Sequence, residues 1–114
     1  MLIIKLLEWN YLAMENKQKI LNLLGLAQRA RKVVTGTETV LKQVRAHKAV
    51  IVFVASDSAA NTRKRFTDKC RSYDVSLTLD FTELELSSAI GQKRSVIAVT
   101  DKGFGRKMLE LLST

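Results

Sequence analysis

The sequence predicts an α/β protein, a three-layer α/β/α sandwich with a central mixed sheet of about four strands. Apolar runs rich in β-branched residues alternate along the chain with segments whose apolar residues recur at helical spacing. Residues 17–114 contain no proline, no Gly/Ser-rich linker and no long repeat that would mark a domain boundary. The 114 residues suit a single domain. Alternating strands and helices require crossover connections, which place helices on both faces of the sheet.

Two helices and two strands are expected in the first half of the domain. Asn16 is predicted to cap a helix that continues to about Arg31, with an apolar stripe made by Ile20, Leu23, Leu24, Ala27 and Ala30. Residues 33–35 then form a short strand, and residues 36–48 form a second, amphipathic helix. Residues 49–55 (AVIVFVA) are apolar without interruption, which is typical of a strand covered on both faces. We therefore expect them at the centre of the sheet.

A third helix and a third strand follow. Ser56 or Asp57 is expected to cap a helix that runs to about residue 73, with an inner face formed by Ala59, Thr62, Phe66 and Cys70. Residues 75–79 are predicted to form a half-buried strand, because Val75, Leu77 and Leu79 alternate with polar residues.

The last elements have the clearest local signals. Thr82 and Glu85 have the spacing of a capping box, which begins a helix through residue 90. Residues 95–99 (SVIAV) are predicted to be another buried strand. Asp101 is expected to cap the final helix, and the glycines of the sequence DKGFG at 101–105 to provide a turn before it.

The first 13 residues (MLIIKLLEWNYLA) are apolar but too short to span a bilayer, and Lys5 and Glu8 interrupt them. They also lack the cleavage pattern of a secretory signal. We interpret them as an N-terminal extension, dispensable for folding, that precedes a single domain at residues 14–114. No membrane association is expected, and a cytoplasmic location is predicted.

Charge is the most informative feature of the composition. The chain carries 19 Lys and Arg against 11 Asp and Glu, for a formal net charge of +8. Residues 17–48 hold eight basic residues and one acidic residue, whereas residues 49–114 hold ten and eight. This uneven distribution favours a basic face for a polyanionic partner. The alternative interpretation is a solvated cationic surface.

No pattern of enzyme or metal-site residues is found. A single cysteine and a single histidine cannot supply a zinc cluster or an internal disulfide, and we interpret Cys70 as a core residue and His47 as an exposed helix end. Glu83 and Glu85 fit the start of a helix, where carboxylates complement the dipole. The P-loop and dinucleotide-loop glycine patterns are absent. The sequence therefore predicts a protein that is not an enzyme and has no cofactor.

Two segments have the residue types of a nucleic-acid site. Residues 36–42 (GTETVLK) combine a glycine, a helix N-terminus with open N–H groups, two hydroxyls, one carboxylate and a lysine. Residues 90–94 (IGQKR) combine an apolar residue and a glycine with two cations. Such groups suit bulged RNA, whose splayed bases need close backbone approach and nearby cations. We expect both segments at the same end of the sheet; a plain helix cap is the alternative for the first.

Four stretches of the chain resemble a known family. They are LGLAQRARKVVTGTETVLKQVRAHKA at 24–49, VFVASDSAANT at 52–62, TDKC at 67–70 and SSAIGQKRSVIAVTDKGFG at 87–105. Together they resemble the YlxQ-type bacterial members of the ribosomal protein L7Ae superfamily, whose relatives bind kink-turn RNA. The resemblance covers almost the whole domain. It implies an α/β/α sandwich that binds RNA and has no enzymatic activity.

The resemblance also assigns residues. Gly36 begins the RNA-contacting helix and Lys42 is the motif lysine, but Glu38-Thr39 stands where kink-turn binders have Asn-Glu. General RNA binding is therefore better supported than strict kink-turn recognition. The predicted RNA-binding residues are Lys32, Gly36, Thr37, Glu38, Thr39, Lys42, Ile90, Gly91, Gln92, Lys93 and Arg94.

The expected partners are ribosomal RNA or another bulged, structured RNA, in the context of the ribosome or of translation factors, with the protein as a monomer. The alternative function is a protein-interaction adaptor on the same fold, without kink-turn specificity. Salt separates the two hypotheses, because binding through phosphates weakens steeply with salt and binding through an apolar patch does not. A third hypothesis is that the chain is related to the substrate-binding domain of RNA methyltransferases. That function would require a fused catalytic domain.

Overall fold

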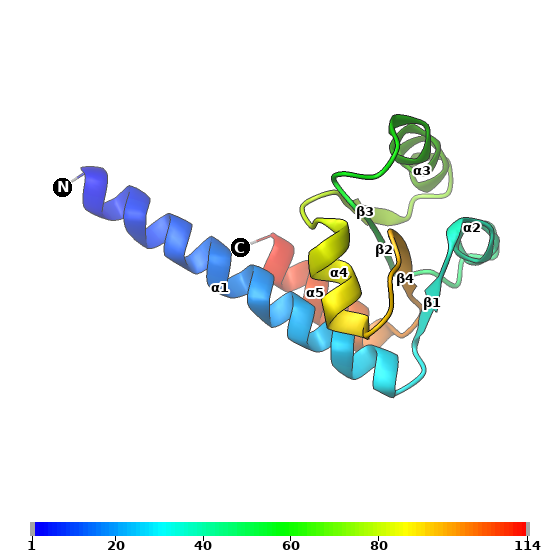
Figure 1. Cartoon of the computed structure of the whole chain (residues 1–114), viewed down its shortest axis with the longest axis horizontal. Coiled ribbons are helices and arrows are strands. Elements are labelled where there is room, and N and C mark those ends of the chain that lie inside the picture. The colour runs from blue at the N-terminus through cyan, green and yellow to red at the C-terminus, as the bar shows by residue number, and fades with distance from the viewer. Residues whose placement is uncertain (1, 114) are drawn as a thin grey trace.

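The computed structural model describes residues 2–113, with side chains from residue 11 onward. In this part of the chain helices and strands alternate as predicted (Figure 1). The elements are α1 (Leu2–Arg29), β1 (Val33–Thr35), α2 (Thr37–Arg45), β2 (Ile51–Val54), α3 (Ala60–Ser72), β3 (Ser76–Thr78), α4 (Glu83–Ile90), β4 (Val96–Val99) and α5 (Lys102–Leu112).

The four strands form one mixed sheet in the order β1-β4-β2-β3. β4 is antiparallel to both of its neighbours, with Ile97 level with Thr35 of β1 and with Phe53 of β2. β2 and β3 are parallel, as their connection through α3 requires. β2 and β4 are buried along their whole length, so the predicted central position of the 49–55 run is confirmed.

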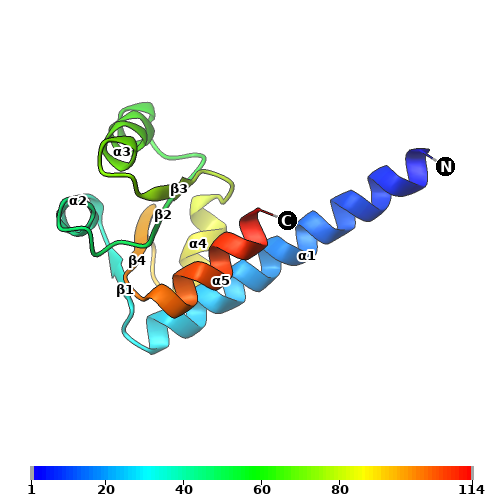
Figure 2. The ribbon, with the colours of Figure 1, turned by 180° about the vertical axis from the view of Figure 1, so that it is seen from behind.

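Helices cover both faces of the sheet, as the sequence predicts. α1, α4 and α5 pack against one face, and α2 and α3 against the other (Figures 1 and 2). Successive side chains of β2 point to opposite faces of the sheet. Ile51 and Phe53 pack against the layer of α1, α4 and α5, and Val52 and Val54 pack against the layer of α2 and α3. Cys70 is buried in the second core, as predicted. Burial raises the pKa of its thiol to about 11.

α1 begins well before the predicted cap. Asn16 lies inside the helix, and its Nδ2 donates a hydrogen bond to the carbonyl of Leu111 at 3.3 Å. The reason is local: residues 2–24 contain neither proline nor glycine and are rich in good helix formers, so nothing stops the helix from extending toward the N-terminus. Its N-terminal half projects beyond the rest of the domain (Figures 1 and 2).

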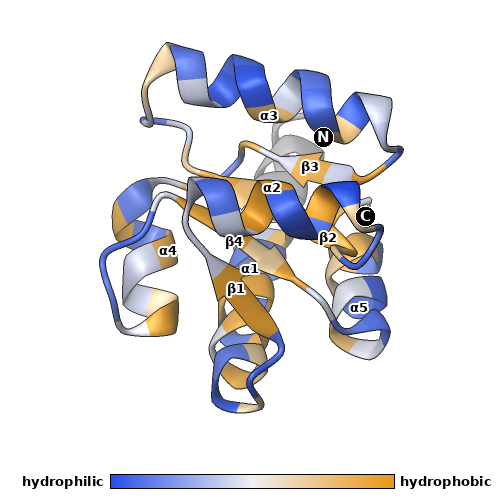
Figure 3. Cartoon of the chain, turned by 90° about the vertical axis from the view of Figure 1, so that its right-hand side faces the viewer, coloured by the Kyte–Doolittle hydropathy of each residue, from blue (hydrophilic) through white to orange (hydrophobic). Residues whose placement is uncertain are grey.

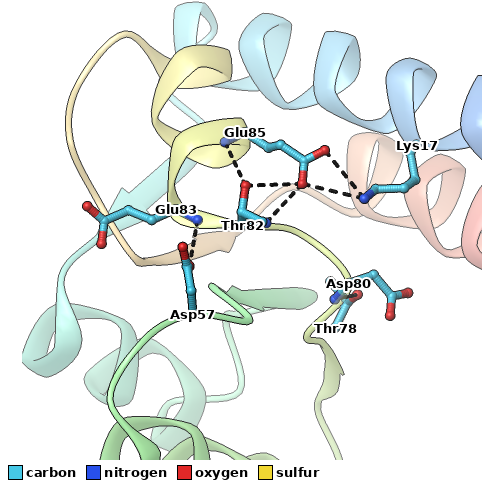
Figure 4. A network of polar contacts seen from close by, with 7 residues as sticks. All are labelled: Lys17, Asp57, Thr78, Asp80, Thr82, Glu83 and Glu85. Carbon is cyan, nitrogen blue, oxygen red and sulfur yellow. Dashed lines mark hydrogen bonds and ion pairs between the residues drawn. The ribbon is translucent and has the colours of Figure 1, made fainter.

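Two further expectations were wrong in detail. α3 has Ala59 as its N-cap, with no side-chain cap, whereas the carboxylate of Asp57 accepts a hydrogen bond from the backbone N–H of Glu83 at 2.9 Å (Figure 4). In β3 the buried side chain is Thr78, and Leu79 lies exposed beyond the end of the strand. The first error arises because Asp57 bonds the start of α4 instead of the start of α3.

The predicted capping box is confirmed and is extended by a residue from α1. The hydroxyl of Thr82 accepts from the N–H of Glu85, and Glu85 Oε1 accepts from the N–H of Thr82 at 3.0 Å (Figure 4). Lys17 Nζ lies 3.4 Å from Glu85 Oε2. The hydrogen bond from Thr82, with the charge of Lys17, lowers the pKa of Glu85 below its ordinary value. Asp101 caps α5 as expected, accepting from the N–H of Phe104.

Deletion of residues 1–13 is expected to leave the domain folded. The residues of α1 that enter the core are Ile20, Leu24 and Ala27, whereas Tyr11 and Leu12 are exposed. Residues 11 and 12 thus bury little apolar surface against the domain. Thermal unfolding followed by circular dichroism is the measurement, and a large fall in Tm for the deletion would contradict the expectation.

No helix among residues 2–113 is long and apolar enough to cross a membrane.

Candidate nucleic-acid interface

The two predicted segments meet at one end of the sheet, as expected. β1 and β4 are antiparallel, so the chain leaves β1 where it enters β4. There the N–H of Gly36 donates to the carbonyl of Val96 at 3.0 Å, and Arg94 Nε donates to Thr35 Oγ1 at 3.2 Å. Figure 3 shows the polar connection from α4 to β4 beside the start of α2. A pocket of about 260 Å³ between them is lined by Gly36, Thr37, Glu83, Lys93, Arg94, Ser95 and Val96.

Gly36 presents an open helix N-terminus to this surface. It is the N-cap of α2, with φ 93° and ψ 148°, a conformation that only glycine adopts without strain. No side chain caps the helix there, so the first N–H groups of α2 have no side-chain acceptor. A Cβ at this position would meet nothing within 4 Å. The site therefore combines backbone donors, the positive end of a helix dipole and room for a ligand.

Residues 91–94 are held in a defined conformation. Gly91 ends α4 in the left-handed region, with φ 79°, and its N–H donates to the carbonyl of Ser87 at 2.9 Å. The Ser87 hydroxyl accepts from the N–H of Arg94 at 3.0 Å and donates to its carbonyl at 3.2 Å. Gln92 is exposed between these anchors. The backbone of the segment is thus fixed, which orients the side chains of Lys93 and Arg94.

Two of the predicted residues do not belong to this surface. Ile90 is only 7% exposed and packs in the core with α1 and α5, because it lies one turn after Leu86 on the inner face of α4. Lys32 precedes β1 and therefore lies at the opposite end of that strand, where its carbonyl accepts from the N–H of Thr100 at 2.9 Å. The apolar contact and the additional cation expected from these residues are not available to the surface described above.

α3 contributes a cation that the sequence analysis missed. Arg65 lies 3.2 Å from Glu38 Oε1, and both side chains are largely exposed. Thr39 and Lys42 are also exposed on α2. The available signal was the basic run TRKRF at 62–66, but its relation to α2 depends on how the two helices pack. We call the surface formed by residues 36–39, Lys42, residues 91–94 and Arg65 the basic end of the domain.

Acidic side chains are interspersed among these cations. Glu83 lines the pocket and lies 3.9 Å from the ammonium group of Lys93, whose side chain is 88% exposed. Such an exposed pair is weak, so Lys93 can reach a ligand at little cost. Glu38 is paired with Arg65, and its removal would leave that guanidinium unpaired. The charges at this end suit a phosphate backbone together with a hydrogen-bond donor such as a base amino group.

Two titratable residues considered in the sequence analysis, His47 and Glu85, lie outside the basic end. Among the described residues, no three His, Cys, Asp or Glu side chains are grouped as metal ligands. His47 is exposed just after α2 and contacts the Tyr73 ring edge-on at a centroid distance of 5.6 Å. Glu85 belongs to the capping box.

Comparison with known proteins agrees with this description. Residues 18–109 match the model of the ribosomal protein L7Ae/L30e/S12e/Gadd45 family. The RNA-binding protein YlxQ of Enterococcus faecium is 44% identical over 97 residues, which cover 85% of this chain and 94% of that protein. The RNA-binding protein YlxQ of Bacillus subtilis (strain 168) is 45% identical over 91 residues, covering 79% and 91% respectively.

Two solved structures share the fold. A protein of unknown function from Bacillus halodurans C superposes with a TM-score of 0.81 at 41% identity, covering 84% of this chain and 98% of the other. The Giardia lamblia 15.5kD RNA binding protein gives a TM-score of 0.74 at 21% identity, covering 87% and 86%, a similarity of fold. The chain therefore belongs to the ribosomal protein L7Ae/L30e/S12e/Gadd45 family, as a YlxQ-type member.

Proposed function

We propose that this protein binds structured RNA through the basic end and catalyses no reaction. The observation that carries the proposal is the junction of β1 with β4, which brings the open N-terminus of α2 beside Lys93 and Arg94. The names of the YlxQ relatives, which describe RNA-binding proteins, support it. We further propose a bulged RNA, such as a kink-turn in ribosomal RNA or in another RNA of translation, as the target.

Each part of the basic end has a role in this proposal. The N–H groups at the start of α2 hold one phosphate, and the missing side chains of Gly36 and Gly91 let the RNA backbone come close. Lys42, Lys93 and Arg94 neutralise neighbouring phosphates. Glu38 accepts a hydrogen bond from an exposed base amino group. No aromatic ring takes part, so splayed bases are bound at their edges rather than by stacking on a protein ring.

Replacing Lys42 or Arg94 by alanine is expected to weaken binding mainly through charge. If each cation neutralises one phosphate, each variant should lower the slope of log affinity against log salt by about 0.7 to 0.9. The loss should be similar for a kink-turn hairpin and for an unbulged duplex. Titration of both RNAs at several salt concentrations measures it. Lys107→Ala on α5 is the matched control, because it removes one exposed cation far from the basic end.

Replacing Glu38 by alanine is expected to change RNA preference more than overall affinity. The variant loses the acceptor for a base, so the ratio of affinities for the kink-turn hairpin and the duplex should fall. The same titrations measure this ratio. If Glu38→Ala instead tightens binding to both RNAs alike, Glu38 acts only as the partner of Arg65 and complements the dipole of α2. Negligible, salt-insensitive binding of wild type to both RNAs would favour the adaptor function.

A further inference from the structure

The end of the sheet opposite the basic end also carries exposed cations. The chain enters β1 and β2 there and leaves β4, because β4 is antiparallel to both of its neighbours. Lys32 directly precedes β1, and its carbonyl accepts a hydrogen bond from the backbone N–H of Thr100, just after β4, at 2.9 Å. Residues 31–32, 46–50 and 100–102 therefore lie together. We call the four exposed cations of these segments the second basic surface: Arg31, Lys32, Lys48 and Lys102.

A pocket of about 470 Å³ lies among these segments. Its walls include the side chains of Gln43, His47, Lys48, Thr100 and Lys102. Two lysines from elements far apart in the sequence thus flank one hollow, and an amide and a hydroxyl lie between them. The hollow offers hydrogen-bonding groups together with positive charge, which is the combination that an anionic, oxygen-rich ligand requires.

The charges of the second basic surface are not balanced by neighbouring carboxylates. Within the part of the chain whose side chains are described, none of its four cations forms an ion pair. The nearby Asp101 is occupied as the cap of α5, where it accepts from the N–H of Phe104 at 2.9 Å. Asp74 precedes the edge strand β3, which lies on the other side of β2 from β4. At the basic end, by contrast, Glu38 and Glu83 pair with cations.

The fold gains nothing from the placement of two of these cations. Arg31 ends α1 with φ 60°, and the N–H of the next residue donates to the carbonyl of Ala27 at 2.9 Å. This helix-end position is usually glycine, because the left-handed region is strained for a residue such as arginine. Lys102 is the first residue of α5, where a cation faces the positive end of the helix dipole. Both placements indicate that the side chains serve binding.

We propose that the second basic surface binds the phosphate backbone of a second RNA segment, so that one chain connects two segments of RNA. The proposal rests on the proposed function, because the basic end holds the first segment. Lysine and arginine that neutralise phosphates give binding that is independent of base sequence. A protein partner is less suited, since protein interfaces have an apolar centre. The exposed large apolar side chains among the described residues lie on α1, on α4 and just after β3.

The affinity of the full chain for two RNAs tests the proposal. The first RNA is a bulged hairpin, and the second is the same hairpin joined to a plain duplex by a flexible single-stranded linker. Wild type should bind the second RNA about 10-fold more tightly. The reason is that the linker holds the duplex at about 1 mM, which exceeds a weak, non-specific dissociation constant of about 10⁻⁴ M.

Two variants should reduce this gain without weakening binding of the hairpin alone. Lys48→Glu/Lys102→Glu should abolish it, because both side chains flank the pocket. The Tm should change little, since a carboxylate is favourable at the start of α5 and unfavourable after the end of α2. Arg31→Gly should lose part of the gain while its Tm stays equal or rises, because glycine relieves the left-handed φ. A residue that served only the fold would show the reverse.

Lys19→Glu/Lys107→Glu is the matched control, because it changes the net charge equally at exposed sites on α1 and α5 outside both surfaces. It should keep the gain. Equal affinities of wild type for the two RNAs would overturn the proposal, and so would a gain that the control loses as completely as Lys48→Glu/Lys102→Glu does. If Lys48→Glu/Lys102→Glu lowers the Tm, the result with Arg31→Gly decides.

Two further outcomes separate this proposal from other interpretations. Wild type that shows no gain, but whose hairpin complex binds a polyglutamate peptide through Lys48 and Lys102, would assign the surface to an acidic protein. Wild type that binds neither RNA would contradict the proposed function as well. Binding of the hairpin without a gain contradicts only the second surface.

Discussion

The double variant Lys42→Glu/Arg94→Glu is expected to bind a bulged RNA about 100-fold more weakly than wild type in 0.1 M salt. The two residues lie on different elements, α2 and the connection before β4, and both face the basic end. Each reversal replaces attraction of a phosphate by repulsion. A loss of about 1.4 kcal/mol for each corresponds to a factor of ten. Fluorescence anisotropy with a labelled RNA measures the affinity.

The matched control carries the same change of charge elsewhere. Arg106 and Lys107 are both exposed on α5, on the other face of the sheet from α2. The double variant Arg106→Glu/Lys107→Glu should weaken binding much less, because only the long-range field changes and salt screens it beyond about 10 Å. Equal losses for the two double variants would mean that net charge, and not the basic end, determines the affinity.

Gly105→Ala is expected to lower the free energy of unfolding by about 2 kcal/mol. An added Cβ would lie 2.4 Å from Cγ1 and 2.8 Å from Cβ of Val50, which is far inside van der Waals contact. A valine side chain has little rotameric freedom, and its Cβ moves only with the backbone that leads into β2. Overpacking of this kind costs about 1 to 3 kcal/mol and outweighs the better helix propensity of alanine.

Urea unfolding of the single and double variants measures this effect. Val50→Ala removes both methyl groups, including the Cγ1 at 2.4 Å, but keeps the Cβ at 2.8 Å, so Gly105→Ala/Val50→Ala should recover part of the loss. The double variant then loses less stability than the sum of the losses of the two single variants. Additive losses in the double variant would show that Gly105 is required for a reason other than the approach of Val50.

Local chemistry explains why most of the fold could be predicted from the sequence. The capping box of Thr82 and Glu85 and the cap at Asp101 use atoms within three residues, so their spacing alone identifies them. The uninterrupted apolar run of β2 follows from burial on both faces. The alternation of strands with helices then restricts the topology to a sheet between two helical layers.

Features that depend on distant contacts could not be predicted in this way. Gly105 was interpreted as part of a turn, but it lies in α5, where Val50 packs directly against it. Asp57 has the sequence context of a helix cap for α3, yet its carboxylate accepts a hydrogen bond from the backbone N–H of Glu83 in α4. Asn16 has the residue type of a helix cap, but its side chain donates instead to the carbonyl of Leu111 in α5.

The same distinction applies to the candidate site. That residues 36–42 and 91–94 lie together was predicted from their residue types, and the antiparallel pairing of β1 with β4 is what brings them to one end of the sheet. Ile90 was misplaced because its position one turn after Leu86 places it on the inner face, which the loop-like sequence IGQKR conceals. Arg65 was missed because only the packing of α3 beside α2 brings it to Glu38.

The shortness of the outer strands limits how this protein can associate. β1 and β3 form the two edges of the sheet, and each has only three residues. An edge so short offers few unpaired N–H and C=O groups to an incoming strand, so β-augmentation and edge-to-edge aggregation are disfavoured. Recognition by this domain therefore relies on side chains and helix ends, and its backbone ladder stays closed to other chains.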